Sequence, residues 1–346
     1  MSAESETGRP ATAGPKNILV TGGGGFLGKA IVRQLLADGH RVSSFSRSRH
    51  DALDALGVDQ LCGDIADAGA VTSALGGRDA VFHVAAKAGV WGAFTDYYRT
   101  NVTGTENVIA ACRSGRVPML VYTGSPSVVF DGNDMQGVDE SVPYPDHYHA
   151  PYPETKAMAE QAVLAAADEA LKTVALRPHL IWGPRDGHLI PRLIERARSG
   201  RLRRVGDGAN LVDMIHVENA AEAHLRAADA LGETASAVGG KAYFLSQDEP
   251  INCWHWINDI LALVNLPPVK KSISLSAARR VGLACETLWR IARLPGEPPM
   301  TRFLASQLAT SHWFDVSAAR LDFDYQPRVS TAEGMRQLGE WLRSTK

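Results

Sequence analysis

Residues 17–28, NILVTGGGGFLG, join a short apolar run to a glycine-rich turn. The apolar run predicts a buried strand, and the residues after the glycines predict a helix that begins near Phe26. In this G-x-x-G-x-x-G pattern, Gly22 permits a tight turn, Gly25 lets the backbone approach a pyrophosphate, and Gly28 lets helix and strand pack closely. The free N–H groups at the helix N-terminus would bind the pyrophosphate. The stretch therefore predicts a dinucleotide-binding fold.

Strand and helix patterns alternate from Lys16 onward. The candidate strands are Ile18–Thr21, Arg41–Ser46, Asp59–Cys62, Ala80–His83 and Met119–Thr123. Candidate helices include Leu27–Asp38, Thr103–Arg113 and Pro153–Glu169, and a further strand is expected at Thr173–Leu176. Regular alternation of this kind indicates parallel strands joined by right-handed crossovers, with helices on both faces. We predict an α/β fold with a doubly wound parallel sheet of Rossmann type.

The composition changes after Pro178, where Gly, Pro and aromatic residues become more frequent and the alternation weakens. We therefore expect a nucleotide-binding domain of residues 16–178 plus about 211–245. A smaller substrate lobe would consist of about 179–210 plus 246–346. Residues 1–15 lack the basic start and apolar core of a signal peptide, and their composition predicts a disordered tail.

The bulk properties exclude several classes of protein. The 346-residue chain has a formal net charge of −2, which argues against a nucleic-acid binder. No apolar run is long enough to span a bilayer. The four cysteines form no C-x-x-C pair, which favours reduced thiols in a cytoplasmic protein. No His, Cys and Asp residues have metal-ligand spacing, so we predict no metal site.

The end of the second strand bears on the choice of cofactor. An acid there would bind the ribose 2′-hydroxyl of NAD, whereas an arginine accommodates the 2′-phosphate of NADP. The chain has no acid there until Asp51; Arg47 can pair with a phosphate bidentately, and Ser46 can donate to it. The alternative is that Arg47 is an ordinary surface charge. We predict NADP(H), with its adenine near Asp64 and Ile65.

Tyr152 and Lys156 are four residues apart at the start of a predicted helix, so both side chains share one face. A neighbouring ammonium lowers the pKa of a phenol, and Lys156 could also bind the nicotinamide ribose. Ser125 follows the fifth strand, at the edge of a parallel sheet where ligands bind. Its hydroxyl could bond a reacting oxygen as negative charge builds. Ser127 competes for that role, and Ser125 could also be a simple turn hydroxyl.

These features together resemble the extended short-chain dehydrogenase/reductase family, and most closely its 3β-hydroxysteroid dehydrogenase branch. The motifs that carry the resemblance are Thr21-Gly22-x-x-Gly25-Phe26-Leu27-Gly28, Asp64, His83-x-Ala85-Ala86, Asn101-Val102-x-Gly104-Thr105, Ser125, Tyr152-x-x-x-Lys156, Arg177-Pro178-x-x-Ile181-x-Gly183-Pro184 and Ile215-His216-Val217-x-Asn219. The resemblance implies further cofactor contacts at Ala85, Lys87 and Pro178. It also implies that Tyr152 protonates the substrate oxygen and that Asn101 supports a proton relay to Lys156.

Within that branch, residues 85–92, 177–184, 296–304 and 311–334 carry a closer resemblance. They imply an NADPH-dependent reductase that converts 2-alkyl-3-oxoalkanoic acids to the 3-hydroxy acids in bacterial long-chain olefin synthesis. Three alternatives stay open. One is a 3β-hydroxysteroid or sterol-4-carboxylate dehydrogenase, another is a nucleotide-sugar epimerase, and a third is an NADP-sensing protein without catalysis.

A β-keto acid substrate needs a cation for its carboxylate and an apolar groove for its tails. The candidate cations are Lys87, Arg185, His188 and Arg302, of which Lys87 and Arg185 are preferred. The candidate apolar contacts are Trp91, Phe94, Trp182, Trp289 and Phe303. Each aromatic residue could equally belong to the core of the lobe. His179 and His216 are weaker candidates, because His216 occupies the position of a structural loop histidine in the family.

Two other stretches bear on partners. Arginines between residues 192 and 204 form a basic run, which is either a solvated surface or a funnel for an acidic partner. The segment Ala277–Leu294 mixes apolar residues with arginines, so it could lie on a membrane surface or pack as a helix of the lobe. The resemblance implies a homodimer and association with neighbouring enzymes of the pathway.

Overall fold

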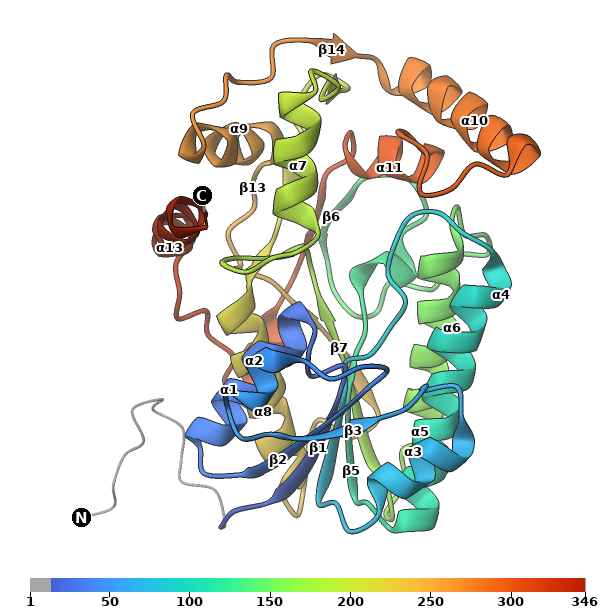
Figure 1. The fold of residues 1–346 in the computed structure, drawn as a ribbon, viewed down its shortest axis with the longest axis vertical. Helices are drawn as coiled ribbons and strands as arrows, with labels where there is room; N and C mark the ends of the chain where they lie inside the picture. Colours follow the sequence, from blue (N-terminus) through green and yellow to red (C-terminus); the bar gives the residue numbers. More distant parts are fainter. Residues whose placement is uncertain (1–13, 346) are drawn as a thin grey trace.

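The structure, a computed structural model, describes residues 14–345 (Figure 1). Seven parallel strands form the main sheet in the order β12-β7-β5-β4-β1-β2-β3. The strands are β1 (Asn17–Thr21), β2 (Arg41–Ser46), β3 (Asp59–Cys62), β4 (Ala80–His83), β5 (Met119–Thr123), β7 (Lys172–Pro178) and β12 (Lys241–Leu245). The strand order reverses between β1 and β4, and ligands of such sheets bind beyond the carboxyl ends of the strands at this point.

Helices cover both faces of this sheet (Figure 1). One face carries α1 (Phe26–Ala37) and α8 (Val217–Gly232); the other carries α3 (Ala68–Leu75), α5 (Gly104–Gly115) and α6 (Pro151–Ala165). Side chains of β1 alternate between the two cores: Ile18 and Val20 pack under α1 and α8, whereas Leu19 packs on the opposite side. The predicted doubly wound fold is confirmed.

The bounds of the elements follow the predictions closely. Four of the five strands predicted up to residue 123 have the predicted bounds, and the first begins one residue earlier, at Asn17. The helix predicted at residues 153–169 is α6. Pro151 occupies its first turn, where the fixed φ of proline suits a helix. After the helix, Asp168 accepts hydrogen bonds from the N–H groups of Ala170 (2.9 Å) and Leu171 (2.8 Å), and this turn leads into β7.

A second lobe lies beyond the carboxyl ends of the main strands (Figure 1). Its sheet has the order β13-β10-β15-β6. The strands of this sheet are β6 (Met135–Val138), β10 (Leu211–Val212), β13 (Ile251–Asn252) and β15 (His312–Phe314). Two further sheets have two strands each: β8 (Ile181–Trp182) pairs with β11 (Ile215–His216), and β9 (Arg204–Val205) pairs with β14 (Ser272–Ile273). The helices are α7 (Leu189–Arg198), α9 (Cys253–Leu263), α10 (Leu275–Ala292), α11 (Arg302–Gln307) and α13 (Thr331–Ser344).

Some segments cross the boundary that the sequence suggested. β6, expected in the nucleotide-binding domain, pairs with β15, and β10 lies in the same second sheet. α12 (Ser317–Phe323), expected in the substrate lobe, contributes Ala319 and Phe323 to the core under α8 and β12. The division into two domains therefore stays a proposal with these exchanges. Residues 1–13 of the predicted tail lie outside the described residues.

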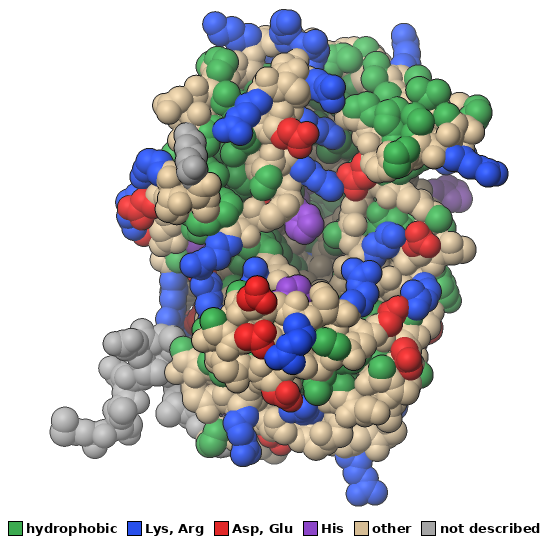
Figure 2. All heavy atoms as spheres, viewed as in Figure 1, with side chains coloured by type: hydrophobic (Ala, Val, Ile, Leu, Met, Phe, Trp, Pro, Cys, Tyr) green, Lys and Arg blue, Asp and Glu red, His purple; other side chains and the backbone are tan. Residues whose placement is uncertain are grey.

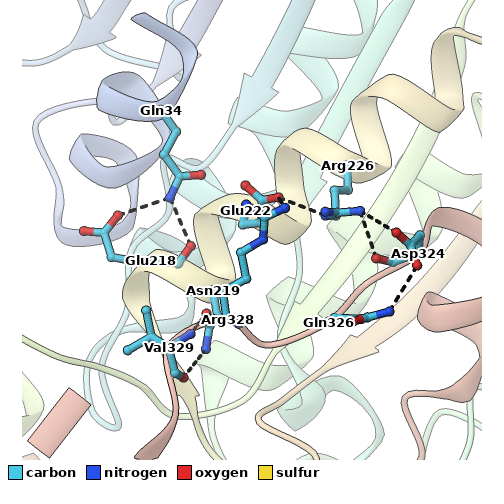
Figure 3. Close-up of polar contacts among 9 residues, drawn as sticks. All are labelled: Gln34, Glu218, Asn219, Glu222, Arg226, Asp324, Gln326, Arg328 and Val329. Atoms are coloured by element: carbon cyan, nitrogen blue, oxygen red, sulfur yellow. Dashed lines mark hydrogen bonds and ion pairs between the residues drawn. The ribbon is translucent and has the colours of Figure 1, made fainter. Parts of the chain in front are cut away.

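Asn219, the last residue of the motif at the start of α8, makes structural contacts, as Figure 3 shows. Asn219 accepts hydrogen bonds from the N–H groups of Arg328 (3.0 Å) and Val329 (2.9 Å), and it donates to the Val329 carbonyl (2.8 Å). Further along α8, Arg226 pairs with Asp324 at 2.9 Å (Figure 3). These contacts fasten the segment before α13 to the nucleotide-binding domain. Within residues 14–345, no helix is long and apolar enough to cross a membrane.

Candidate active site

The glycine-rich turn between β1 and α1 leaves room that side chains would fill. Gly22 has a φ of +71°, and a Cβ there would lie 3.0 Å from the Cα of Ala85. A Cβ on Gly28 would collide with the carbonyl oxygen of Gly22. Gly25 precedes α1, whose first turn has neither a capping side chain nor an acid. The first N–H groups of this helix therefore suit an anion, and the turn fits the pyrophosphate of a dinucleotide.

The two arginines after β2, Arg47 and Arg49, differ in their contacts. Arg49 pairs with Asp54 at 2.5 Å, whereas Arg47 is exposed and near enough to Asp64 to lower its pKa. The N–H of Ala66 is the largest cause of the low pKa of Asp64, and an ion pair with Arg99 at 2.6 Å adds to it. Ser46, the other candidate for the 2′-phosphate, donates its hydroxyl to the Ser48 carbonyl at 2.8 Å. Ile65, the candidate adenine contact next to Asp64, is buried against Gly104.

The structure brings Ser125 and Tyr152 together at the carboxyl end of β5. Burial raises the pKa of the Tyr152 phenol, and a hydrogen bond with Ser125 lowers it in part. Ser125 precedes the short 3₁₀ turn η2 (Pro126–Val129), and its hydroxyl oxygen lies 2.9 Å from that of Ser127. It also accepts from the Ser127 N–H at 3.3 Å. The tyrosine and one serine of the predicted catalytic set therefore interact directly.

The side chain of Lys156 is buried against the end of β5. Its ammonium donates to the carbonyl of Thr123 at 2.6 Å and lies 4.1 Å from the ring centre of Tyr122. Burial lowers the pKa of Lys156 to about 7, against an opposing effect of Glu160. Lys156 is not among the groups that shift the pKa of Tyr152 here. The ammonium is therefore directed to the end of β5, and its predicted lowering of the Tyr152 pKa stays a prediction.

Asn101 lies in a π-helical turn, η1 (Tyr98–Thr103), that delays the start of α5 to Gly104. Such turns are frequent at functional sites. The Asn101 side chain accepts from the N–H of Lys87 (2.7 Å) and donates to its carbonyl (3.1 Å) and to Thr155 (3.0 Å). Asn101 therefore fastens the loop after β4 to α6, and its part in a proton relay stays a prediction.

A cavity of about 130 Å³ opens beside Ser125. It is lined by Ser125, Pro126, Ser127, Phe130, Met135, Pro178, His179, Leu180, Gln307, His312 and Phe314. The residues come from both lobes, and Figure 2 shows that the surface is hollowed between them. Phe130, Met135 and Phe314 are not predictable as cavity residues from the sequence, because nothing in their local patterns distinguishes them from core residues.

Two histidines form one wall of this cavity. A hydrogen bond of 3.1 Å joins His179 Nε2 to His312 Nδ1, and His312 Nε2 donates to the Gln307 carbonyl at 2.9 Å. Burial lowers the pKa of both imidazoles, so both are uncharged near neutral pH. The wall is therefore polar but carries no charge. Within residues 14–345, no three His, Cys, Asp or Glu side chains are grouped so as to hold a metal ion.

The predicted substrate contacts lie elsewhere. The lining of the cavity does not include Lys87, Trp91 or Arg185. Lys87 pairs with Asp96 at 3.3 Å on the loop after β4, and Arg185 is exposed with a φ of +70°. The side chain of Trp91 is half-buried on the same loop as Lys87.

Three of the other candidates for substrate contacts have structural partners, whereas His188 and Phe94 are exposed. Trp182 is fully buried, with its ring centre 5.7 Å from that of Trp256, so it is a core residue. Phe303 is buried edge-on against the cavity residue Phe130. Arg302 is occupied by an ion pair with Glu286 at 2.8 Å.

Comparison with known proteins agrees with this geometry. The model of the 3-beta hydroxysteroid dehydrogenase/isomerase family matches residues 19–275. A 2-alkyl-3-oxoalkanoate reductase of Stenotrophomonas maltophilia (strain K279a) is 54% identical over 93% of this chain and 98% of its own length. A protein of the same name from Shewanella oneidensis is 47% identical over 98% of this chain and 89% of its own length.

Solved structures resemble the whole fold. The structure of MoeE5 in complex with UDP-glucose and NAD has a TM-score of 0.72 and 26% identity, and the match covers 95% of this chain and 99% of that one. The glycine turn, the catalytic-type tyrosine and lysine, and the extent of the sequence match lead to one conclusion. The chain belongs to the 3-beta hydroxysteroid dehydrogenase/isomerase family and is an NAD(P)-dependent oxidoreductase.

Proposed function

We propose that this protein uses NADPH to reduce the 3-keto group of a 2-alkyl-3-oxoalkanoic acid to the 3-hydroxy acid. The observation that carries the proposal is the position of Ser125, which lies at the carboxyl end of β5 beside both the Tyr152 phenol and the cavity of about 130 Å³. The names of the two bacterial relatives support this substrate class. A place in long-chain olefin synthesis stays a prediction from the sequence resemblance.

Different residues of the nucleotide-binding domain would contact successive parts of the cofactor. Gly22, Gly25 and the first N–H groups of α1 would hold the pyrophosphate. Arg47 would pair with the 2′-phosphate, and Asp64 would lie beside the adenine, with Ile65, Ala85 and Pro178 as further contacts. When bound, NADPH supplies the hydride that reduces the carbonyl carbon.

Tyr152 donates its phenolic proton to the oxygen that gains negative charge, and Ser125 donates a hydrogen bond to the same oxygen. Burial raises the pKa of Tyr152, so the phenol carries its proton at neutral pH and is in the protonation state that a donor needs. Lys156 would then hold the ribose, with Asn101 supporting the return of a proton to the site.

The charges around the cavity suggest how the substrate lies. Because His179 and His312 are uncharged, the cavity suits an alkyl branch better than a carboxylate. The carboxylate would then face Lys87 or Arg185, whose side chains reach solvent. Trp91, on the same loop as Lys87, would border a second alkyl tail.

The test follows NADP⁺ reduction with a 2-alkyl-3-hydroxyalkanoic acid and, separately, with a 3β-hydroxysteroid. The hydroxy acid is used because the keto acid can lose CO₂. We expect turnover of the hydroxy acid only, and its loss in Tyr152→Phe without loss of NADPH binding. Turnover of the steroid alone would assign the chain to the steroid dehydrogenases, and near-normal activity of Tyr152→Phe would contradict the proposed mechanism.

Size-exclusion chromatography would test whether the protein is a homodimer, and cell fractionation would test whether it is cytoplasmic.

A further inference from the structure

The helix α10 exposes an unusual amount of apolar surface. Among residues 14–345, five of the nine large hydrophobic side chains that are exposed lie on α10 or just after it. They are Val281 (46% exposed), Leu283 (49%), Leu288 (53%), Ile291 (78%) and Leu294 (38%). Figure 2 shows the hydrophobic surface over this helix at the upper right of the molecule. Several large apolar side chains exposed on one helix are typical of a surface that binds a membrane or another protein.

The inner side of α10 is already occupied. Ala278, Gly282 and Glu286 are buried at helical spacing against the neighbouring helix α11. A Cβ on Gly282 would lie 2.7 Å from the N atom of Arg302, so the two helices are in close contact. Glu286 accepts from the Arg302 backbone at 2.7 Å and from its guanidinium at 2.8 Å. The helix is therefore fixed on one side, and its outer residues Val281, Leu288 and Ile291 project away from the fold.

The charge on α10 has one sign at its surface. Arg280, Arg290 and Arg293 are exposed, whereas the single acid of the helix, Glu286, is buried in its ion pair with Arg302. Basic residues beside an apolar helix face suit the surface of an anionic bilayer, where both the hydrophobic burial and the charge are favourable. A two-fold contact with a second copy would place this same basic patch against itself.

The end of α10 also touches the loop of the candidate active site. The guanidinium of Arg290 lies 5.9 Å from the ring centre of Trp91. Glu297, three residues after Leu294, accepts from the N–H of Val90 at 3.4 Å and pairs with Arg192 of α7 at 3.0 Å. A surface bound by α10 would therefore lie next to the loop that carries Lys87 and Trp91.

We infer that the outer face of α10 binds peripherally to an anionic lipid surface. The apolar side chains would enter the interface, and the arginines would contact the lipid phosphates. The benefit to catalysis rests on the proposed function, because a substrate with long alkyl tails partitions into lipid and would reach the site from there. The binding itself depends only on the residues of α10.

The experiment measures co-sedimentation of the full-length protein with vesicles of phosphatidylcholine, with and without phosphatidylglycerol. We expect binding to the anionic vesicles that weakens as salt is added. Leu288→Glu/Ile291→Glu should reduce this binding by about tenfold or more. Arg280→Gln/Arg293→Asn should remove its dependence on phosphatidylglycerol. The matched control is Leu321→Glu on α12, which replaces an even more exposed leucine, 84% exposed, and should bind as the unmodified protein does.

Failure of the unmodified protein to bind either vesicle would overturn the inference, as would an equal loss in Leu321→Glu. A dimer that Leu288→Glu/Ile291→Glu converts to a monomer would assign the face to a second copy instead. A short-chain, water-soluble 2-alkyl-3-hydroxy acid separates the two proposals. All three variants should oxidise it at the unmodified rate, so loss of lipid binding with retained turnover leaves the proposed function intact. Lipid binding without turnover would contradict only the proposed function.

Discussion

The hydroxyl oxygens of Ser125 and Ser127 lie 2.9 Å apart, and it is Ser125 that also hydrogen-bonds Tyr152. From the sequence, either serine could donate a hydrogen bond to the reacting oxygen. The two serines differ in their contacts, because Ser125 acts on the Tyr152 phenol, whereas Ser127 hydrogen-bonds Ser125. This arrangement favours Ser125 as the direct hydrogen-bond donor to the reacting oxygen. Ser127 would then orient the hydroxyl of Ser125.

The first prediction concerns these two serines. Ser125→Ala should lower kcat by about a hundredfold or more, because it removes a donor to the developing oxyanion. Ser127→Ala should lower kcat by less than about tenfold, since only the orientation of Ser125 is affected. Steady-state kinetics of both variants provides the measurement, with NADPH affinity as the control for folding. A larger loss in Ser127→Ala would reverse the assignment.

The second prediction concerns the cofactor. Arg47→Gln should raise the KM for NADPH by about tenfold while leaving the KM for NADH unchanged, because only NADPH carries the 2′-phosphate. Arg49→Gln is a matched control two residues away, since Arg49 is already paired with Asp54. Equal effects of the two substitutions, or a preference of the unmodified protein for NADH, would show that Arg47 is only a surface charge.

The third prediction concerns the pH dependence of activity. The pKa of Lys156 is lowered to about 7, so its ammonium loses a proton as the pH rises through that value. We expect kcat/KM for NADPH to fall above about pH 7, because this ratio reports ionisations of the free enzyme. Lys156→Arg keeps a positive charge throughout this range and should give a lower but flatter profile. A profile of the unmodified protein that is level up to pH 9 would contradict the assignment.

The fourth prediction concerns stability. Asp213 is fully buried, and burial raises its pKa to about 7 despite a hydrogen bond from the Phe314 N–H at 2.7 Å. Because the folded pKa exceeds the unfolded value of about 3.9, the bound proton stabilises the fold fully below about pH 4. That stabilisation is lost as the pH rises through about 7.

Asp213→Asn cannot ionise and keeps an oxygen for the Phe314 N–H. Its free energy of unfolding, relative to the unmodified protein, should therefore increase between pH 4 and pH 8 by about 1 to 4 kcal/mol. Urea denaturation at several pH values measures this difference. Asp59→Asn, at an exposed carboxyl group on β3, is the control and should show no such increase. A constant difference between Asp213→Asn and the unmodified protein would disprove the linkage.

Much of the fold was predictable because its signals are local. The bounds of β2, β3, β4 and β5 follow from short apolar runs between turns. The need for glycine at Gly22 and Gly28 also appears in the sequence, since a tight turn and a close helix contact have no other good solution. The sequence predicts the wrong lobe for segments such as β6 and α12, because the elements they pack against are distant in the chain.

The sequence by itself determined the alternating strands and helices, the glycine turn and the placement of Tyr152 and Lys156 on one helix, since each depends on neighbours within a few residues. Only the tertiary structure decided that Lys156 bonds the Thr123 carbonyl, that Ser125 meets Tyr152, and that His179 meets His312, 133 residues away. These contacts join separate elements, and their geometry depends on how whole surfaces pack. No local pattern encodes such packing, which is why the cavity beside Ser125 emerged only from the folded chain.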